Sequence, residues 1–196
     1  MSAPPDYRTV ELFGGAITVA LPSTFADVSA IRQVPDHQEV YLDQAGFTSI
    51  VVEVLERVEK PDDDALQYHL QDLAEEDVGD VKVWGQGCEP VHFSKLPQGT
   101  PAYTLLATSP PGAKQRGRAN EPEFVGILLT MIRLVEQKTD LIIAINVPHV
   151  AGTYDEAEVD LAGGKYGKLI EAAMGLREKV VETLEIRDWG LFVQGD

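Results

Sequence analysis

The sequence contains a single cysteine, Cys88, so no disulfide can form within the chain. Such sparing use of cysteine is typical of proteins that work in a reducing compartment. The N-terminal residues have neither the basic start nor the apolar core of a secretory signal peptide. No apolar run reaches the roughly 18 residues that a membrane helix needs. These absences predict a protein of the nucleus and cytoplasm with no membrane partner.

Basic residues are also scarce. Only 16 lysines and arginines stand against 32 aspartates and glutamates, which gives a net charge of −16. Nucleic acids and anionic membranes bind positive surfaces, so neither is an expected partner. The charge favours a basic protein partner that associates faster at low salt. Solubility alone is the alternative explanation of the acidic composition.

The length of 196 residues fits one ordinary globular domain. A chain of this size buries roughly 70% of the surface that its unfolded form exposes, so it needs no disulfide or metal for stability. With 44% hydrophobic and 24% charged residues, global disorder is not expected. No internal repeat or linker is visible. We therefore expect one monomeric domain over residues 8–196, after a flexible tail of residues 1–7.

Several segments have the pattern of β-strands. Two short apolar segments, 9–13 and 16–21, flank a Gly-Gly pair, which indicates a hairpin. Segment 39–43 alternates between apolar and polar residues, and segment 48–58 is apolar on both faces. A strand of the second kind needs covering layers on both sides of its sheet. Further strands are expected at 80–93, 101–109, 123–137 and 141–148, of which the last two form a central hairpin.

Two segments have the periodicity of α-helices. Segment 61–77 opens with a proline and three aspartates, which suit the first turn of a helix. In segment 165–186, apolar residues recur at close to the helical spacing: Leu169, Ala173, Leu176, Val180 and Leu184. The connecting segment 22–31 contains Ser29, which is expected to cap one short helical turn.

The order of these elements predicts the fold class. Most strands are joined by hairpins, and the helices come between groups of strands rather than after each strand. This order indicates an α+β fold, with an antiparallel β-sheet sandwiched between helices as an α/β/α sandwich.

The candidate metal sites are weak. Cys88 and His92 share a face of a predicted strand, but two side chains do not make a zinc site and no second pair of ligands appears. His69 and Asp72 lie one turn apart on the first predicted helix, where they either ligate a metal or simply stabilise the helix. The aspartates at 62–64 lack the spacing and the glycine of a calcium loop. We predict no metal and no cofactor.

Evidence for catalysis is equally thin. The sequence has no phosphate-binding loop, no nucleophile elbow and no zinc-protease motif. Glu53 and Glu56 resemble the paired carboxylates of acid–base catalysts. However, residues three apart on a strand point to opposite faces, so these two converge only across a twist or a bulge. We expect that the protein is not an enzyme, and an enzyme that uses Glu53 and Glu56 as acid and base remains the less favoured alternative.

Short motifs spread over most of the chain resemble one known family. They are "LFGGAI" at 12–17, "DVS-IR-VPD-QEV" at 27–40, "SIVVEVLE" at 49–56, "YHLQDLAEE" at 68–76, "MIRL" at 131–134 and "TDLIIAINVP" at 139–148. Together they are similar to the Mog family, the Ran guanine-nucleotide release factors. The resemblance implies a fold like that of the photosystem protein PsbP. It also implies a protein that binds the small GTPase Ran, promotes release of its guanine nucleotide and supports nuclear protein import.

The same resemblance implies which residues bind the partner. The acidic residues on the strand that matches "SIVVEVLE" are Glu53 and Glu56, and the second polar motif adds Asp36, Gln38 and Glu39. The chain either promotes nucleotide release from Ran or acts as an adaptor, which binds the GTPase without changing its affinity for nucleotide. Glu53 also has a purely structural alternative, as a strand-end residue held by hydrogen bonds. A PsbP-like module that serves another partner is the weakest alternative.

Three segments depart from the family pattern. The loop 110–122 holds the only dense basic cluster of the chain, Lys114, Arg116 and Arg118, and matches no family motif. The acidic loop 149–164 matches none either. The segment 43–48 is short where some relatives carry an insertion. The contacts of these loops with the partner therefore stay undefined, whereas the expected partner-binding residues are not affected.

Overall fold

A computed structural model describes residues 3–29, 34–74, 80–112 and 116–192. Within these ranges the chain forms ten β-strands and two α-helices. Seven strands make one antiparallel sheet in the order β3-β4-β5-β9-β8-β7-β6. Their bounds are Phe25–Asp27 (β3), Gln38–Asp43 (β4), Ser49–Glu56 (β5), Lys82–Pro90 (β6), Ala102–Ser109 (β7), Phe124–Leu134 (β8) and Thr139–His149 (β9).

The remaining three strands form a second, smaller sheet, where a single sheet was expected. The predicted N-terminal hairpin is present as β1 (Tyr7–Leu12) and β2 (Ile17–Pro22). The free edge of β2 pairs with β10 (Glu185–Ile186) from the C-terminal part of the chain, in the order β1-β2-β10. The short segment β10 carries no distinct strand pattern in the sequence, because only tertiary packing brings it to β2.

The central hairpin of the large sheet is confirmed. β8 and β9 pair over their full length, and almost every residue in them is buried. The apolar periodicity of β8 alone does not distinguish a strand from a buried helix, so its frequent β-branched residues were the decisive signal. The glycine-interrupted strand is confirmed as β6, which has a bulge between Trp84 and Glu89.

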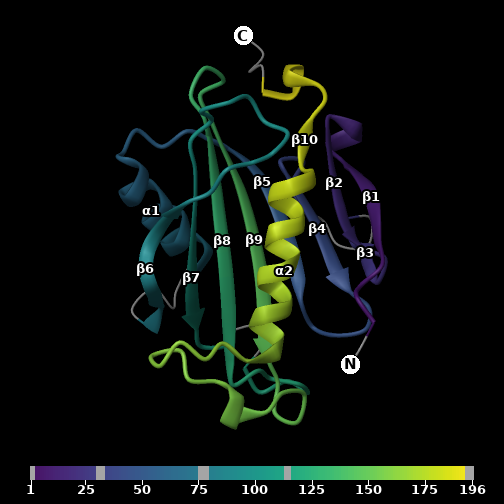
Figure 1. Ribbon diagram of the computed structural model, residues 1–196, viewed down its shortest axis with the longest axis vertical. Helices are drawn as coiled ribbons and strands as arrows, with labels where there is room; N and C mark the ends of the chain where they lie inside the picture. The colour runs from purple at the N-terminus through teal and green to yellow at the C-terminus, as the bar shows by residue number, and fades with distance from the viewer. Residues whose placement is uncertain (1–2, 30–33, 75–79, 113–115, 193–196) are drawn as a thin grey trace.

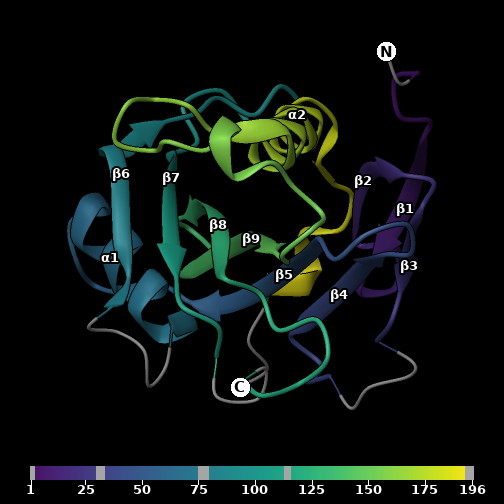
Figure 2. The ribbon, with the colours of Figure 1, turned by 90° about the horizontal axis from the view of Figure 1, so that it is seen from below.

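The two α-helices cover opposite faces of the large sheet, which confirms the expected α+β sandwich. Helix α1 (Asp62–Ala74) lies on one face, and α2 (Gly167–Thr183) lies on the other face beside the small sheet (Figures 1 and 2). Helix α2 is shorter than the predicted segment 165–186, and α1 begins one residue after the predicted start at residue 61. The last three predicted residues of the first helix, 75–77, lie outside the described part of the chain.

Each face of the large sheet has its own hydrophobic core. The larger core joins the sheet to α2 and to the small sheet, and the predicted helical residues Ala173, Leu176, Val180 and Leu184 are buried in it. The smaller core joins the sheet to α1 through Leu66 and Leu70. Strand β5 contributes to both, as its two apolar faces predicted. No helix in the described residues is long and apolar enough to cross a membrane.

Two local expectations need correction or comment. The connecting segment 22–31 contains the short edge strand β3. Ser29 donates its hydroxyl to Glu39 Oε2 (3.2 Å), and the helical turn that it was expected to cap falls on residues 30–33, which lie outside the described residues. At the N-terminus, β1 already begins at Tyr7, and Ser23 donates to the carboxylate of Asp6 (2.9 Å).

Candidate partner-binding site

The predicted binding residues begin with a pair on adjacent strands. Gln38 of β4 lies directly opposite Glu53 of β5. Residues opposite each other in a sheet share a face, and this face is the one that α1 covers further along the sheet. Gln38 Nε2 donates to Glu53 Oε1 (2.6 Å), and both side chains are half-buried. Glu53 Oε2 has no partner within the described residues, so the carboxylate keeps an acceptor for a ligand.

Glu39 has a different role because it points to the other face of the sheet. Its Oε1 accepts from the backbone N–H of Phe13 (2.9 Å), and its Oε2 accepts from Ser29. The side chain therefore clamps the turn of the β1–β2 hairpin to the large sheet. Both carboxylate oxygens are engaged within the chain, and the structure does not bring Glu39 to the Gln38–Glu53 pair.

Glu56 and Asp36 lie near the same end of β5. Glu56 is the last residue of the strand, opposite Thr139, and its side chain is exposed. Asp36 is exposed in the turn before β4, where Val54 N donates to the carbonyl of His37 (2.9 Å) and holds that turn beside β5. Within the described residues neither carboxylate has a polar partner, so both are free to bind an external group.

The surroundings of Glu53 include residues that the sequence did not single out. On the same face, Val40 lies opposite Val51, and both are half-buried. Tyr68 projects from α1 with 46% of its surface exposed. The signal for Tyr68 was its place within the "YHLQDLAEE" motif, but a surface position on a helix cannot be assigned to a site without the packing of that helix.

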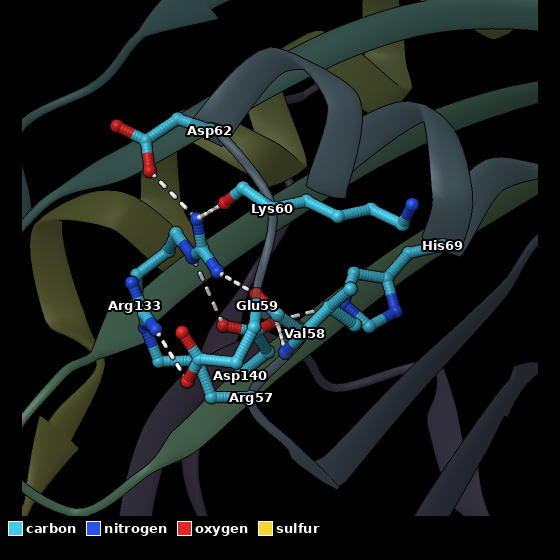
Figure 3. A network of polar contacts seen from close by, with 8 residues as sticks. All are labelled: Arg57, Val58, Glu59, Lys60, Asp62, His69, Arg133 and Asp140. Carbon is cyan, nitrogen blue, oxygen red and sulfur yellow. Dashed lines mark hydrogen bonds and ion pairs between the residues drawn. The ribbon is translucent and has the colours of Figure 1, made fainter.

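A buried ionic network, drawn in Figure 3, lies on the same face of the sheet, where Asp140 is opposite Leu55 of β5. Arg133 of β8 is 1% exposed, and its Nε donates to Asp140 Oδ1 on β9 (3.2 Å). Its Nη1 donates to Asp62 Oδ1 (2.8 Å) and to the carbonyl of Lys60 (2.8 Å), and its Nη2 donates to the carbonyl of Val58. One guanidinium thus joins the central hairpin to the β5–α1 connection and to the start of α1.

Asp140 completes the network and is fully buried. Its Oδ2 accepts from Val58 N (3.1 Å) and from His69 Nε2 (2.9 Å), so Nε2 is the ring nitrogen that donates. Burial alone raises the pKa of Asp140, but the hydrogen bonds from His69 and Val58 and the charge of Arg133 bring this pKa below its ordinary value. The carboxylate is therefore ionised and saturated, which suits a structural role rather than proton transfer.

The other chemical candidates from the sequence are not brought together as sites. His69 points to Asp140, whereas Asp72, its predicted partner, is exposed. Burial and the nearby charges of Asp63 and Asp62 raise the pKa of Cys88, which disfavours a thiolate nucleophile. The described residues contain no group of three or more His, Cys, Asp or Glu side chains that is arranged to hold a metal ion. Of the basic cluster, Lys114 lies outside the described residues.

Comparison with known proteins decides the family. The sequence profile of the family described as "Ran-interacting Mog1 protein" matches residues 10–148. The chain belongs to this family. The nuclear import protein MOG1 of Saccharomyces cerevisiae is 34% identical, over 94% of this chain and 84% of the yeast protein. The Ran guanine nucleotide release factor of Bos taurus is 33% identical, over 72% of this chain and 76% of the bovine protein.

Solved structures agree with the Mog1 assignment. The crystal structure of the yeast Ran-binding protein Mog1p superposes with a TM-score of 0.70 at 31% identity, and covers 97% of this chain and all of that chain. The solution structure of cyanobacterial PsbP from Synechocystis gives a TM-score of 0.54 at 11% identity, and covers 94% of each chain. The second likeness shows the fold alone. The resemblance to the Mog family and the PsbP-like fold are therefore both confirmed.

Proposed function

We propose that this chain binds the small GTPase Ran, promotes release of its guanine nucleotide and supports nuclear protein import. The observation that carries this proposal is the match of residues 10–148 to the Ran-interacting Mog1 family. The names of the yeast and bovine relatives, a nuclear import protein and a Ran guanine nucleotide release factor, support it further. The proposed molecule is one monomeric domain over residues 8–196 that works in the nucleus and cytoplasm.

The proposed contact surface is the end of β5 that carries free carboxylates. Glu53 is held by Gln38 with one oxygen left over, Asp36 is exposed in the turn before β4, and Glu56 is exposed at the last position of β5, on the other face of the strand. Glu39 supports this surface from behind by clamping the β1–β2 hairpin. Carboxylates on a chain with a net charge of −16 complement basic side chains and steer a basic partner to the site.

Nucleotide release follows from linkage between two binding equilibria. If the chain binds nucleotide-free Ran more tightly than nucleotide-loaded Ran, nucleotide must bind Ran more weakly in its presence by the same factor. Such a factor needs no covalent step. Its side chains need only contact a surface of the GTPase that differs between the two states.

Two other functions remain distinguishable by experiment. An adaptor would bind Ran at the same surface and leave the rate of nucleotide release unchanged. An enzyme using Glu53 and Glu56 would need the two carboxylates to converge, but alternation places them on opposite faces of β5. This arrangement favours binding over acid–base catalysis.

The test is release of a fluorescent guanine nucleotide from purified Ran, with and without this protein, at two salt concentrations. We expect wild type to accelerate release, and the double variant Glu53→Lys, Glu56→Lys to lose this effect. The matched control is Glu171→Lys, Glu178→Lys, which makes the same charge change on the exposed surface of α2. Binding without faster release would support the adaptor, and no binding by wild type would overturn the proposal.

A further inference from the structure

We propose that the interface with the partner GTPase extends from Glu53 onto an apolar and aromatic surface between β4–β5 and α1, where Tyr68 packs on a basic side chain of the partner. This inference rests on the proposed function. It assigns the central contact to Tyr68 and Val40, and it leaves the carboxylates to steer the partner at the rim. We call this the Tyr68 surface, made of Tyr68, Val40, Leu42, Val51 and Glu53.

The first observation is a sheet face that α1 does not cover. Helix α1 packs on β7 and β8, and Figure 2 shows it under that half of the sheet. Val40 and Leu42 of β4 point to the same face, yet among the described residues they belong to neither hydrophobic core. Both are only half-buried. Neighbouring apolar side chains that stay accessible mark a contact surface more often than isolated ones do.

The second observation is the direction of Tyr68. Helical geometry places Ala65, Tyr68 and Asp72 on one flank of α1. Lys60, which lies between β5 and α1 in the chain, has its Nζ over the Tyr68 ring. Strands β6 and β5 lie on opposite sides of β8 in the sheet, so the flank with Tyr68 faces β5 and β4. The exposed ring is therefore directed toward the side of the sheet that carries β5 and the less covered strand β4.

The third observation is that the Tyr68 ring contacts a buried and hydrogen-bonded neighbour. Its ring makes an edge contact with His69, with 5.6 Å between ring centroids, and His69 is buried and held by Asp140. An aromatic side chain that loses little freedom on binding is the usual centre of a protein interface. The buried network thus contacts, through His69, the residue that we place at the centre of the interface.

The fourth observation identifies the chemistry of the partner group. Lys60 Nζ lies 5.9 Å from the centroid of the Tyr68 ring, within the range of a cation–π contact. Glu53 and Asp72 border the same surface, and Asp72 is exposed on the Tyr68 flank. A cation is therefore favoured over this ring. A lysine or arginine of the partner that takes the place of Lys60 gains both the aromatic face and the nearby carboxylates.

The test compares Ran binding by wild type and by single variants, with association and dissociation rates measured at two salt concentrations. We expect Tyr68→Ala to weaken binding about tenfold, mainly through faster dissociation, as truncation of a central aromatic does. We expect Val40→Thr, which keeps the shape of the side chain, to weaken binding about threefold. Neither change alters the dependence on salt, because neither removes a charge.

Lys60→Gln is expected to strengthen Ran binding, whereas the two previous variants weaken it. It removes the internal cation from the ring, and its backbone carbonyl can still accept from Arg133. We expect binding to tighten about twofold, because a basic group of the partner then meets no like charge at Tyr68. A purely structural role of this surface predicts no tightening. Unchanged or weaker binding by this variant would count against the proposed exchange of cations.

Matched controls use positions away from the Tyr68 surface. Val83→Thr changes a 36% exposed valine on β6, at the opposite edge of the sheet, and Gln71→Ala changes an exposed residue on α1. Both should bind Ran as wild type does. If wild type binds but Tyr68→Ala and Val40→Thr bind equally well, this inference is overturned and the proposed function stands. If wild type does not bind, the proposed function itself fails.

The alternative to Ran as the occupant of this surface is a second copy of the chain. Sedimentation equilibrium of wild type and Tyr68→Ala decides between the two. We expect both to be monomeric across the concentrations used for binding. A wild-type dimer that Tyr68→Ala dissociates would assign the surface to self-association and overturn the proposal.

Discussion

Two groups of polar side chains lie on the same face of the same sheet, yet their surroundings differ completely. Asp140 pairs with Arg133 under the start of α1, and both are buried and saturated with hydrogen bonds (Figure 3). Glu53 pairs with Gln38 two strands away from β8, and it keeps one free oxygen. The residue type is similar in both places, so the covering helix makes the difference.

The carboxylates of Asp140 and Glu53 therefore have different roles. A buried charge is tolerable only when it is paired and hydrogen-bonded, so Asp140 holds the fold and offers nothing to a ligand. A half-exposed carboxylate loses little hydration and can exchange its partner, so Glu53 suits binding. Four predictions test this difference between buried and exposed carboxylates, from the largest expected loss of stability to the smallest.

The largest effect is expected for Asp140→Ala. It removes one of the two carboxylates that pair with the buried Arg133 guanidinium and leaves Val58 N and His69 Nε2 without their acceptor, which together cost roughly 3–5 kcal/mol in the free energy of unfolding. Urea denaturation measures this loss. The control Asp72→Ala removes an exposed carboxylate from α1 and should change stability by less than about 0.5 kcal/mol. Equal losses in the two variants would contradict the contrast between buried and exposed acids.

Acidification is expected to cause a smaller and reversible loss in the free energy of unfolding. Asp140 has a folded-state pKa below its ordinary value of 3.8, because hydrogen bonds from His69 and Val58 and the charge of Arg133 outweigh the opposing effect of burial. Its contribution to stability is therefore complete above pH 3.8 and is lost as the pH falls through the folded pKa. Urea denaturation as a function of pH measures it. Asp140→Asn should flatten the acid limb, and an unchanged limb would show that other groups govern it.

Glu39→Ala is expected to reduce stability by less than Asp140→Ala and by more than Glu53→Gln. The change removes the acceptor of the Phe13 N–H and of the Ser29 hydroxyl, at a cost of about 1–2 kcal/mol. Because this carboxylate faces the small sheet, the salt dependence of Ran binding should stay that of wild type. Thermal unfolding and binding at two salt concentrations check both statements. A normal stability together with a lower salt dependence would place Glu39 in the interface after all.

The smallest effect on stability, and the clearest effect on binding, is expected for Glu53→Gln. The isosteric amide keeps a hydrogen bond to Gln38 and should change the free energy of unfolding by less than about 0.5 kcal/mol. Association with Ran should slow severalfold at low salt, and the difference should shrink at high salt. Stopped-flow binding measures these rates. A large loss of stability instead would make Glu53 a structural residue.

Much of the fold was predictable because local patterns determine it. The alternation in β5 gave both of its apolar faces, and the spacing of Ala173, Leu176 and Val180 gave the buried face of α2. The second sheet was missed because β10 is two residues long and pairs with β2, which lies far away in the chain. Such a short segment carries no periodicity of its own.

The candidate site was predictable only in part. The motifs named Glu53 and Glu56, and alternation correctly separated them onto two faces of the strand. The internal role of Glu39 depends on Phe13, which lies 26 residues away. The orientation of His69 depends on Asp140, which lies 71 residues away. Neither contact leaves a trace in the spacing of nearby residues.

The sequence by itself determined the elements, the two-sided burial of the large sheet, the excess of negative charge and the family. Periodicity, composition and short motifs are local properties, and they can be read without knowing what lies across the fold. The tertiary structure alone decided which carboxylates are saturated and which are free. That outcome depends on which elements cover each carboxylate, α1 for Asp140 and the β1–β2 hairpin for Glu39, because burial and hydrogen-bond partners are set by residues distant in the chain.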